Sequence, residues 1–300
     1  MKEFIEELHK LNIKIEENVL LSNYTSYKVG GKARIIVYPN TESNLIEVIK
    51  LIKLNNLKYK ILGNGTNLLF SDKDYNDVLI KLNLFNKIKI EGTKITAGSG
   101  ASMPRLAALA KNESLTGLEF AAGIPGTVGG AVFQNAGAYK SDMGYIVQSV
   151  KVLTPDLRII NLSNKECAFH YRTSFFHDNR DYICLEATLK LHKGKKEEIE
   201  KLMKDRLKRR MDSQPLNYPS AGSVFRNPEN QSSGKIIEDL GLKGLKIGGA
   251  EVSEKHANFI INKGNAKAED IHKLILFVQE KVKEEDNIDL KIEQEFVNWE

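Results

Sequence analysis

The chain has 300 residues and a formal net charge of +5, from 44 lysine and arginine residues against 39 aspartate and glutamate residues. This length exceeds the usual size of one domain, so we expect two or three packed domains, and a hydrophobic content of 41% excludes a disordered chain. The small positive charge is not the concentrated basic footprint of a nucleic-acid-binding protein. Because no apolar run reaches the roughly 20 residues of a membrane-spanning helix and the first residues offer no signal-peptide core, we expect a cytoplasmic protein.

The first part of the chain shows the periodicities of a strand, a helix and a second strand. Residues 1–12 predict a short helix, and Thr41 caps a further helix whose apolar residues fall on one face. Short apolar runs that stop at proline or glycine, at 33–39 and 59–65, predict strands before and after this further helix. We therefore expect a small βαβ-like unit here.

Period-two patterns predict a second group of strands. They occupy 78–100, where turn residues separate them, and they return at 147–155, 158–163 and 181–194. Between these stretches, Ser102 is the expected N-cap of a helix that has a proline near its start. The arrangement predicts a second α+β unit.

A proline-rich stretch separates the last third of the chain from the rest. It follows a charged amphipathic helix expected at about 196–212. Helical patterns return at 233–240 and 268–285, with a strand expected between them at 258–262. We therefore predict an α+β fold in three parts: residues 1–80, 81–212 and 213–300.

Glycine is average in number but not in placement. Seven of the 22 glycines fall within the 28 residues of GLEFAAGIPGTVGGAVFQNAGAYKSDMG (117–144), where Gln134 and Asn135 add neutral hydrogen-bond donors. Glycine permits positive φ in turns and lets a ligand approach main-chain N–H groups, and a bound phosphate uses both properties. A run of tight turns is the structural alternative, but this density favours ligand binding.

A second glycine-rich loop, GNGTN at 63–67, follows a strand-like run and offers main-chain amides that suit a pyrophosphate. An ordinary turn explains this loop about as well. The dinucleotide fingerprint G-x-G-x-x-G fails because its sixth position is Leu68, and no G-x-x-x-x-G-K-[ST] occurs. These observations disfavour a Rossmann dehydrogenase and a P-loop NTPase. The six histidines show no metal-ligand spacing, so we predict no metal site.

Seven segments spread over nearly the whole chain resemble the UDP-N-acetylenolpyruvoylglucosamine reductase family. They are YTSYKVGGKA (24–33), ILGNGTNLL (61–69), GLEFAAGIPGTVGGAVFQNAGAY (117–139), YRTSFF (171–176), PSAGSVFRNP (219–228), GLKGLKIGGAEVSEKHANFIIN (241–262) and IEQE (292–295). Seven motifs in the family's order argue against coincidence. The short connection after YRTSFF resembles the shorter subclass of the family, which lacks a tyrosine-bearing substrate loop.

The resemblance implies a two-subdomain FAD-binding region of the vanillyl-alcohol-oxidase (PCMH) type and a small C-terminal α+β substrate domain. It implies noncovalent FAD, NADPH as co-substrate, and reduction of UDP-N-acetylglucosamine enolpyruvate to UDP-N-acetylmuramate for peptidoglycan synthesis. Two alternatives remain open at this point: another FAD-dependent oxidoreductase on the same scaffold, and a non-enzymatic nucleotide-sensing protein. We expect no nucleic acid, no membrane and no obligate protein partner.

The matched motifs also imply residue roles. Arg172 and Glu295, with Glu293 as the alternative to the latter, stabilise the charge that develops beside the substrate carboxylate, and Ser223 protonates the neighbouring carbon. The implied substrate contacts are Asn227, His256 and Lys243. The implied FAD contacts are mostly main-chain groups, at Gly30, Gly31, Gly63, Asn64, Gly65, Thr66, Asn67, Gly123, Gly126, Thr127, Gly129 and Gly130.

Overall fold

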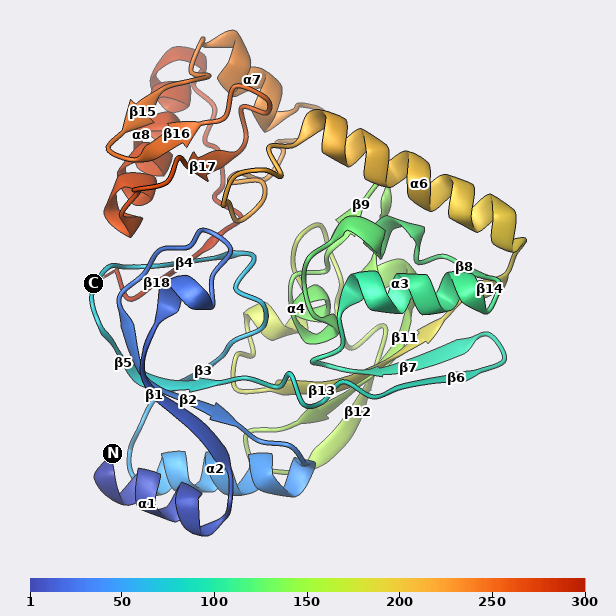
Figure 1. The fold of residues 1–300 in the computed structure, drawn as a ribbon. Coiled ribbons are helices and arrows are strands. Elements are labelled where there is room, and N and C mark those ends of the chain that lie inside the picture. The colour runs from blue at the N-terminus through green and yellow to red at the C-terminus, as the bar shows by residue number, and fades with distance from the viewer. Residues whose placement is uncertain (300) are drawn as a thin grey trace. The chain divides into compact units, whose positions relative to one another are not determined.

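Contacts within the chain divide it into two compact units, and neither is continuous in the sequence. The computed structural model describes residues 1–299, and Figure 1 labels their helices and strands. Unit 1 comprises Met1–Glu16, Ile35–Gly63 and Asp77–Arg209. Unit 2 comprises Glu17–Arg34, Asn64–Asn76 and the chain from Arg210 onward.

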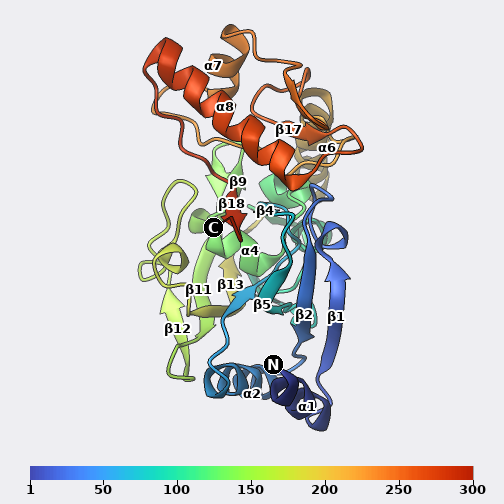
Figure 2. The same cartoon turned by 90° about the vertical axis from the view of Figure 1, so that its left-hand side faces the viewer.

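The first helices and strands form a helix pair and a four-stranded sheet. Helices α1 (Lys2–Lys10) and α2 (Glu42–Leu54) lie side by side in Figures 1 and 2. The sheet has the order β1 (Lys14–Leu20), β2 (Lys32–Tyr38), β5 (Tyr75–Ile80) and β3 (Tyr59–Ile61), and β3 runs parallel to β5. The two strands that flank α2, β2 and β3, are therefore not neighbours in the sheet, because β5 lies between them. The cap of α2 is confirmed, since the Thr41 hydroxyl accepts from the Asn44 N–H.

The second group of strands forms a five-stranded sheet in unit 1. Its order is β12 (Ile159–Ser163), β11 (Val147–Leu153), β13 (Ile183–Lys190), β7 (Lys94–Gly98) and β6 (Ile88–Glu91). All neighbours are antiparallel. Helix α3 (Met103–Asn112) adds its apolar face to the core of this sheet. Ser102 is its N-cap residue, but the serine side chain makes no capping bond.

Short elements carry the glycine-rich stretch of unit 1. They are β8 (Leu115–Thr116), η2 (Glu119–Gly123), α4 (Val128–Phe133), β9 (Gly137–Ala138), β10 (Ser141–Asp142) and α5 (Met143–Ile146). Strand β9 pairs with β10, and β8 pairs with β14 (His192–Lys193). A one-turn helix, η3 (Phe175–His177), follows the YRTSFF motif. The stretch is therefore a chain of tight turns as well as a candidate ligand site.

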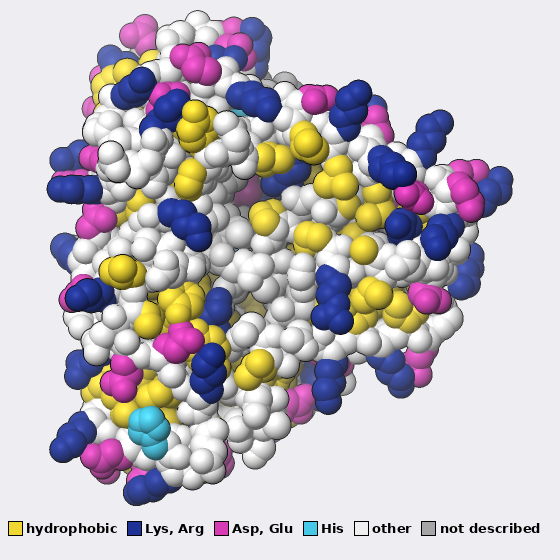
Figure 3. All heavy atoms as spheres, viewed as in Figure 1, with side chains coloured by type: hydrophobic (Ala, Val, Ile, Leu, Met, Phe, Trp, Pro, Cys, Tyr) yellow, Lys and Arg dark blue, Asp and Glu magenta, His cyan; other side chains and the backbone are white. Residues whose placement is uncertain are grey.

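Helix α6 (Lys196–Ser213) confirms the charged helix expected at this place. Ile199 is its one buried residue. Along its length Lys204 pairs with Glu200 at 2.7 Å and Arg209 with Asp205 at 2.8 Å. Figure 3 shows basic and acidic side chains mixed along the outer edge of α6. The many lysines and arginines of α6 therefore form a solvated face of the helix, as expected for a charged amphipathic helix.

The C-terminal part of unit 2 is a small α+β layer. Its sheet has the order β15 (Lys246–Ile247), β16 (Ala250–Val252) and β17 (Ile260–Asn262), and helix α8 (Ala268–Asp286) packs on it (Figure 2). Helix α7 (Ser233–Asp239) contacts α8. The remaining elements of this unit are the one-turn helix η1 (Leu21–Asn23) and the parallel strands β4 (Leu68–Phe70) and β18 (Glu295–Val297).

The contact-based division differs from three contiguous parts. Residues 17–34 and 64–76, both inside the expected first part, belong to the same unit as the C-terminal third. The boundary between Arg209 and Arg210 lies close to the one expected before residue 213. The three-part division itself stays a prediction.

Both cysteines are unpaired thiols in unit 1. Cys167 is buried in a turn after β12, and Cys184, on β13, is half-buried. Burial raises the pKa of the Cys167 thiol to about 11, so this thiol is protonated at neutral pH. Within residues 1–299, no helix is long and apolar enough to cross a membrane.

Candidate functional site

In unit 2, the glycines of the first two family motifs bring separate segments into close contact. A Cβ atom on Gly65 would lie 2.1 Å from the Tyr24 carbonyl oxygen, and one on Gly31 would lie 2.3 Å from the Lys73 carbonyl oxygen. The Gly65 carbonyl also accepts from the Ser26 N–H at 3.1 Å. Gly30 and Gly65 have φ values of +119° and +63°, which L-residues with side chains rarely adopt. The fold itself therefore requires these glycines, whatever ligand they approach.

In unit 1, two other glycines among the predicted FAD contacts, Gly63 and Gly130, have a single atom near the position of a Cβ. A Cβ on Gly63 or Gly130 would meet only the Thr127 hydroxyl oxygen within 4 Å, at 3.2 and 3.5 Å. Thr127 caps helix α4 by accepting from the Gly130 N–H at 3.3 Å. The structure thus brings Gly63, the first residue of GNGTN, together with the glycine-rich stretch at 117–144.

Ser99 supplies a further polar group beside the glycine-rich stretch at 117–144. A Cβ on Gly129 would lie 2.9 Å from the Ser99 Cβ. The Ser99 hydroxyl is buried and has no hydrogen-bond partner among residues 1–299. Buried hydroxyls without a partner are rare because their desolvation is costly. Open glycine faces and an unsatisfied buried hydroxyl fit a dinucleotide such as FAD, whose phosphates need close approach to the main chain.

The other predicted FAD contacts have partners within their own units. The Gly126 carbonyl accepts from the Met103 N–H, and Gly123 ends η2. The side-chain amide of Asn67 donates to the Glu293 carbonyl at 3.1 Å, so this side chain holds the C-terminal segment. For Asn64 and Thr66, the predicted contacts stay predictions.

Ser223 lies in a turn of unit 2 that is held by a buried glutamine. Gln294 is only 5% exposed, and its Nε2 lies 3.3 Å from the Ala221 and Gly222 carbonyl oxygens, both of which accept from it. Its Oε1 accepts from the Tyr27 hydroxyl at 2.9 Å. Gly222 has φ +78° and nothing within 4 Å of its Cβ direction, so the chain before Ser223 is open on that side. Gln294 was not among the predicted site residues, although it stands between the two glutamates of the IEQE motif.

Strand β18 places Glu295 in unit 2. The Glu295 N–H donates to the Asn67 carbonyl at 2.9 Å, and the strand pairs in parallel with β4. Beyond the strand, the Trp299 indole N–H donates to the Leu69 carbonyl at 2.8 Å. The Trp299 ring stacks on His272 of α8, with centroids 4.0 Å apart. Glu295 is therefore fixed from both sides along the chain.

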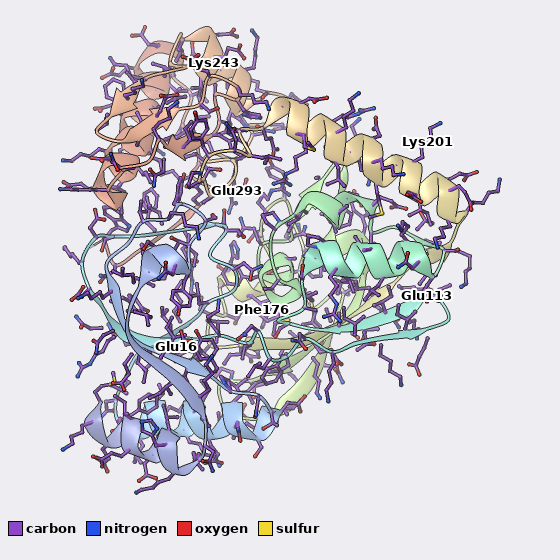
Figure 4. All side chains as sticks on the ribbon, in the orientation of Figure 1. Glu16, Glu113, Phe176, Lys201, Lys243 and Glu293 are labelled. Carbon is purple, nitrogen blue, oxygen red and sulfur yellow. The ribbon has the colours of Figure 1, made fainter. Side chains whose placement is uncertain are left out.

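Helix α7 brings the three predicted substrate contacts together. The Asn227 side chain accepts from the Ser233 N–H at the start of the helix. Lys243 pairs with Glu238 of the helix at 2.7 Å, and Figure 4 labels this lysine in the C-terminal part of unit 2. His256 faces Gly234, whose Cβ would lie 3.2 Å from the imidazole Cε1. Three segments that are separate in the sequence thus surround one short helix.

Arg172 lies in unit 1 with a left-handed backbone. Its φ of +55° is unusual for a residue with a long side chain, and its guanidinium donates to the Gly137 carbonyl at 2.8 Å. Asn135, 2% exposed, holds this region by donating to the His170 carbonyl and accepting from the Gly144 N–H. Strained backbone that the surroundings hold in place is enriched at functional sites, so the geometry supports the role implied for Arg172.

Asp72 and Asp74 lie in an exposed segment between β4 and β5, and both carboxylates accept from main-chain N–H groups. The two Asp72 carboxylate oxygens accept from the Ala268 and Glu269 N–H groups at the start of α8, each at 3.0 Å. Asp74 accepts from the Lys32 N–H. Among residues 1–299, no three His, Cys, Asp or Glu side chains lie close enough to hold a metal ion. The aspartates therefore serve the packing of unit 2.

We predict that His256 is neutral at pH 7 in the ligand-free protein. Burial is the largest effect and holds the pKa of this imidazole below its ordinary value of 6.5. A backbone hydrogen bond opposes this effect, and the Lys243 charge lowers and the Glu238 charge raises the pKa by smaller amounts. The unfolded chain then binds the proton more readily, so His256 contributes stability above pH 6.5 that is lost as the pH falls through the lower folded pKa.

An NMR pH titration of the His256 imidazole checks the lowered pKa, and the His256→Asn variant assigns the resonance. A midpoint at or above the ordinary value would contradict the prediction. In His256→Asn, the loss of unfolding free energy on acidification should be smaller than in the wild-type protein.

Comparisons with known proteins test the expected family and fold. A family model described as an FAD binding domain matches residues 33–163, and the model of the UDP-N-acetylenolpyruvoylglucosamine reductase C-terminal domain matches residues 214–297. The reductase of Clostridium novyi (strain NT) is 46% identical over 286 residues, covering 95% of this chain and 93% of the relative. That of Halalkalibacterium halodurans is 42% identical and covers 99% of both.

Solved structures show the same fold. The crystal structure of UDP-N-acetylenolpyruvylglucosamine reductase (MurB) from Thermus caldophilus matches with a TM-score of 0.82 and 35% identity, covering 95% of this chain and 99% of that one. A glucose dehydrogenase, Phl p 4.0202, shares the fold alone, with a TM-score of 0.50 and 16% identity over 64% of this chain and 44% of that one. The expected fold class and FAD cofactor are confirmed, and the chain belongs to the UDP-N-acetylenolpyruvoylglucosamine reductase family.

Proposed function

We propose that the protein catalyses the NADPH-dependent reduction of UDP-N-acetylglucosamine enolpyruvate to UDP-N-acetylmuramate in peptidoglycan precursor synthesis. The observation that carries the proposal is the match over 95% of the chain to reductases of this name, in the FAD-binding and C-terminal regions alike. The match of the C-terminal domain argues against a different oxidoreductase on the same scaffold and against a nucleotide sensor. Cytoplasmic location, noncovalent FAD and the lack of an obligate partner stay predictions.

Charge that develops on the substrate sets the demands on the side chains. FAD, when bound, supplies the hydride transfer that links NADPH to the enolpyruvyl double bond. Carbanion character then grows beside the substrate carboxylate, which needs positive charge or hydrogen-bond donors. We assign this role to Arg172, because a guanidinium is permanently charged and can bind a carboxylate with two parallel hydrogen bonds.

Ser223 is the proposed proton donor to the carbon next to the carboxylate. A serine hydroxyl is a weak acid, so its effect depends on placement against a strongly basic carbon. The buried Gln294 amide supports this proposal, because it holds the carbonyls of Ala221 and Gly222 and so fixes the backbone before Ser223. Glu295, held on β18, is the proposed carboxylate beside the developing enolic charge, and Glu293 is its alternative.

Helix α7 is surrounded by the three proposed substrate contacts, Asn227, Lys243 and His256. Their proposed role is to bind the nucleotide-sugar part of the substrate. Lys243 supplies positive charge, while Asn227 and the neutral His256 supply hydrogen bonds. Contacts remote from the reacting carbon contribute binding energy that orients the substrate. We therefore expect changes at these three residues to raise KM more than they lower kcat.

A two-step absorbance experiment on the purified flavoprotein tests the proposed function. NADPH should bleach the visible flavin absorbance under anaerobic conditions, and UDP-N-acetylglucosamine enolpyruvate should restore it. UDP-N-acetylglucosamine, which lacks the enolpyruvyl group, is the matched control and should restore nothing. If NADPH bleaches the flavin but the enolpyruvyl substrate leaves it bleached, the assigned substrate is wrong.

We predict that Ser223→Ala separates the two halves of the reaction. The variant should keep FAD and should be bleached by NADPH at the wild-type rate, while recovery with the enolpyruvyl substrate slows by at least about 100-fold, as expected for loss of a general acid. Ser220→Ala, a serine of the same segment with no assigned role, is the control. Equal slowing of both halves would count against a proton-donor role.

For Arg172→Lys we predict a fall in kcat/KM for the enolpyruvyl substrate of the order of 10²-fold, because an ammonium cannot reproduce two parallel hydrogen bonds. Bleaching by NADPH and the melting temperature should change little. Arg158→Lys, in the surface ion pair with Asp156, controls for the general effect of the exchange. Near-normal kcat/KM would show that Arg172 acts only through its bond to Gly137.

A further inference from the structure

A half-buried lysine outside the motifs of the family contacts the glycine-rich loop at 63–67. Lys81 follows β5 in unit 1, and its N–H donates to the Val37 carbonyl at 2.9 Å. Its ammonium donates to the Gly63 carbonyl at 2.6 Å. Burial lowers the pKa of Lys81, and the Glu16 charge opposes this shift. A lysine on a surface usually extends its ammonium into water, so a charge held against a main-chain carbonyl needs a reason.

Glu16 is the acidic residue whose charge acts on Lys81. Figure 4 labels Glu16, which lies on β1. Its carboxylate accepts from the Tyr38 hydroxyl at 2.8 Å and lies 3.3 Å from the Lys14 ammonium. Glu16 thus has a cation and a hydroxyl beside it, its charge favours the protonated form of Lys81, and the Lys81 ammonium also donates to the Gly63 carbonyl.

The acceptor of that bond is the first peptide of the loop. A peptide unit is planar and trans, so fixing the Gly63 carbonyl also fixes the opposite direction of the next N–H group. The Cα face of Gly63 is open except for the Thr127 hydroxyl. A charged donor also polarises the carbonyl it binds, and hydrogen bonds with one ionised partner are about twice as strong as neutral ones.

We propose that Lys81 is a positioning residue for FAD, because its ammonium holds the Gly63 carbonyl so that the N–H on the opposite side of the same peptide can bind a phosphate of the dinucleotide, and its charge polarises that peptide in favour of an anion. This inference rests on the FAD-dependent function proposed above. It concerns a residue outside the seven segments that resemble the family. The Lys81 ammonium and the Gly63 carbonyl both belong to unit 1, and the N–H that they orient is that of the next residue, Asn64. The cost of burying one lysine is then offset when an anionic cofactor binds.

The test measures FAD release from the purified flavoprotein. Serial dilution with detection of released FAD by fluorescence gives Kd for the wild-type protein, Lys81→Met, Lys81→Arg and Lys58→Met. We expect Lys81→Met to raise Kd by about tenfold or more, as loss of a charged hydrogen bond predicts, and Lys81→Arg to restore most of the affinity. Lys58→Met, at an exposed lysine just before β3, should leave Kd within about twofold, because surface substitutions away from a site have small effects.

Salt provides a readout that a purely structural role would not move. The difference in Kd between the wild-type protein and Lys81→Met should shrink as ionic strength rises, because salt screens charge. If Lys81→Met lowers the melting temperature but leaves Kd and its salt dependence unchanged, the proposal is overturned. Should this variant fail to fold, Lys81→Gln, which keeps a polar group there but no charge, gives the same comparison with the same expected increase.

The outcome also separates this inference from the function on which it rests. A wild-type protein that holds no FAD would overturn both. A wild-type protein that holds FAD with the same affinity as Lys81→Met would overturn the inference alone.

Discussion

The side-chain amide of Gln294 joins three segments of unit 2 that are far apart in the sequence. It accepts from the hydroxyl of Tyr27, 267 residues earlier, and donates to carbonyls in the turn that precedes Ser223. Burial of Tyr27 raises the pKa of its hydroxyl, so this group remains a donor at any physiological pH. A buried amide with both ends satisfied fixes a unique arrangement, whereas an unsatisfied one would cost about 1–3 kcal/mol. The positions of Ser223 and Glu295 in unit 2 depend on this group.

The same network explains why the units are discontinuous. Strand β18 pairs with β4, the Trp299 indole bonds to Leu69, and Asp72 caps α8. Each of these contacts joins the segment at 64–76 to the C-terminal part of the chain. The segment that follows the glycine-rich loop is therefore stabilised by the last third of the chain. Local composition and periodicity could not indicate these contacts, because each of them joins residues that are far apart in the sequence.

Local periodicity predicted most of the helices and strands but few of the contacts that build the site. The apolar face of α2, the cap at Thr41 and the ends of α7 and α8 follow from spacing within about one or two helical turns. Strand β18 has three residues, and its partner lies more than 200 residues away, so no local pattern indicated it.

The glycines show a second limit of sequence reasoning. Gly31 and Gly65 are required by close approach of the chain to itself, while Gly63 and Gly130 leave open faces. All four lie in glycine-rich motifs of the sequence, so only the structure distinguishes the two groups. The family motifs named Ser223 and Arg172, but they could not show the amide that holds one or the backbone strain of the other, because those depend on tertiary packing.

The electrostatics around α7 suit reversible binding of a nucleotide diphosphate. Lys243 pairs with Glu238 of the helix, and more than a quarter of each side chain is exposed. Surface ion pairs contribute about 0–1 kcal/mol, so a phosphate can replace Glu238 as the partner at small cost. A lysine held in place by a weak partner is therefore preorganised for an anion without binding it irreversibly.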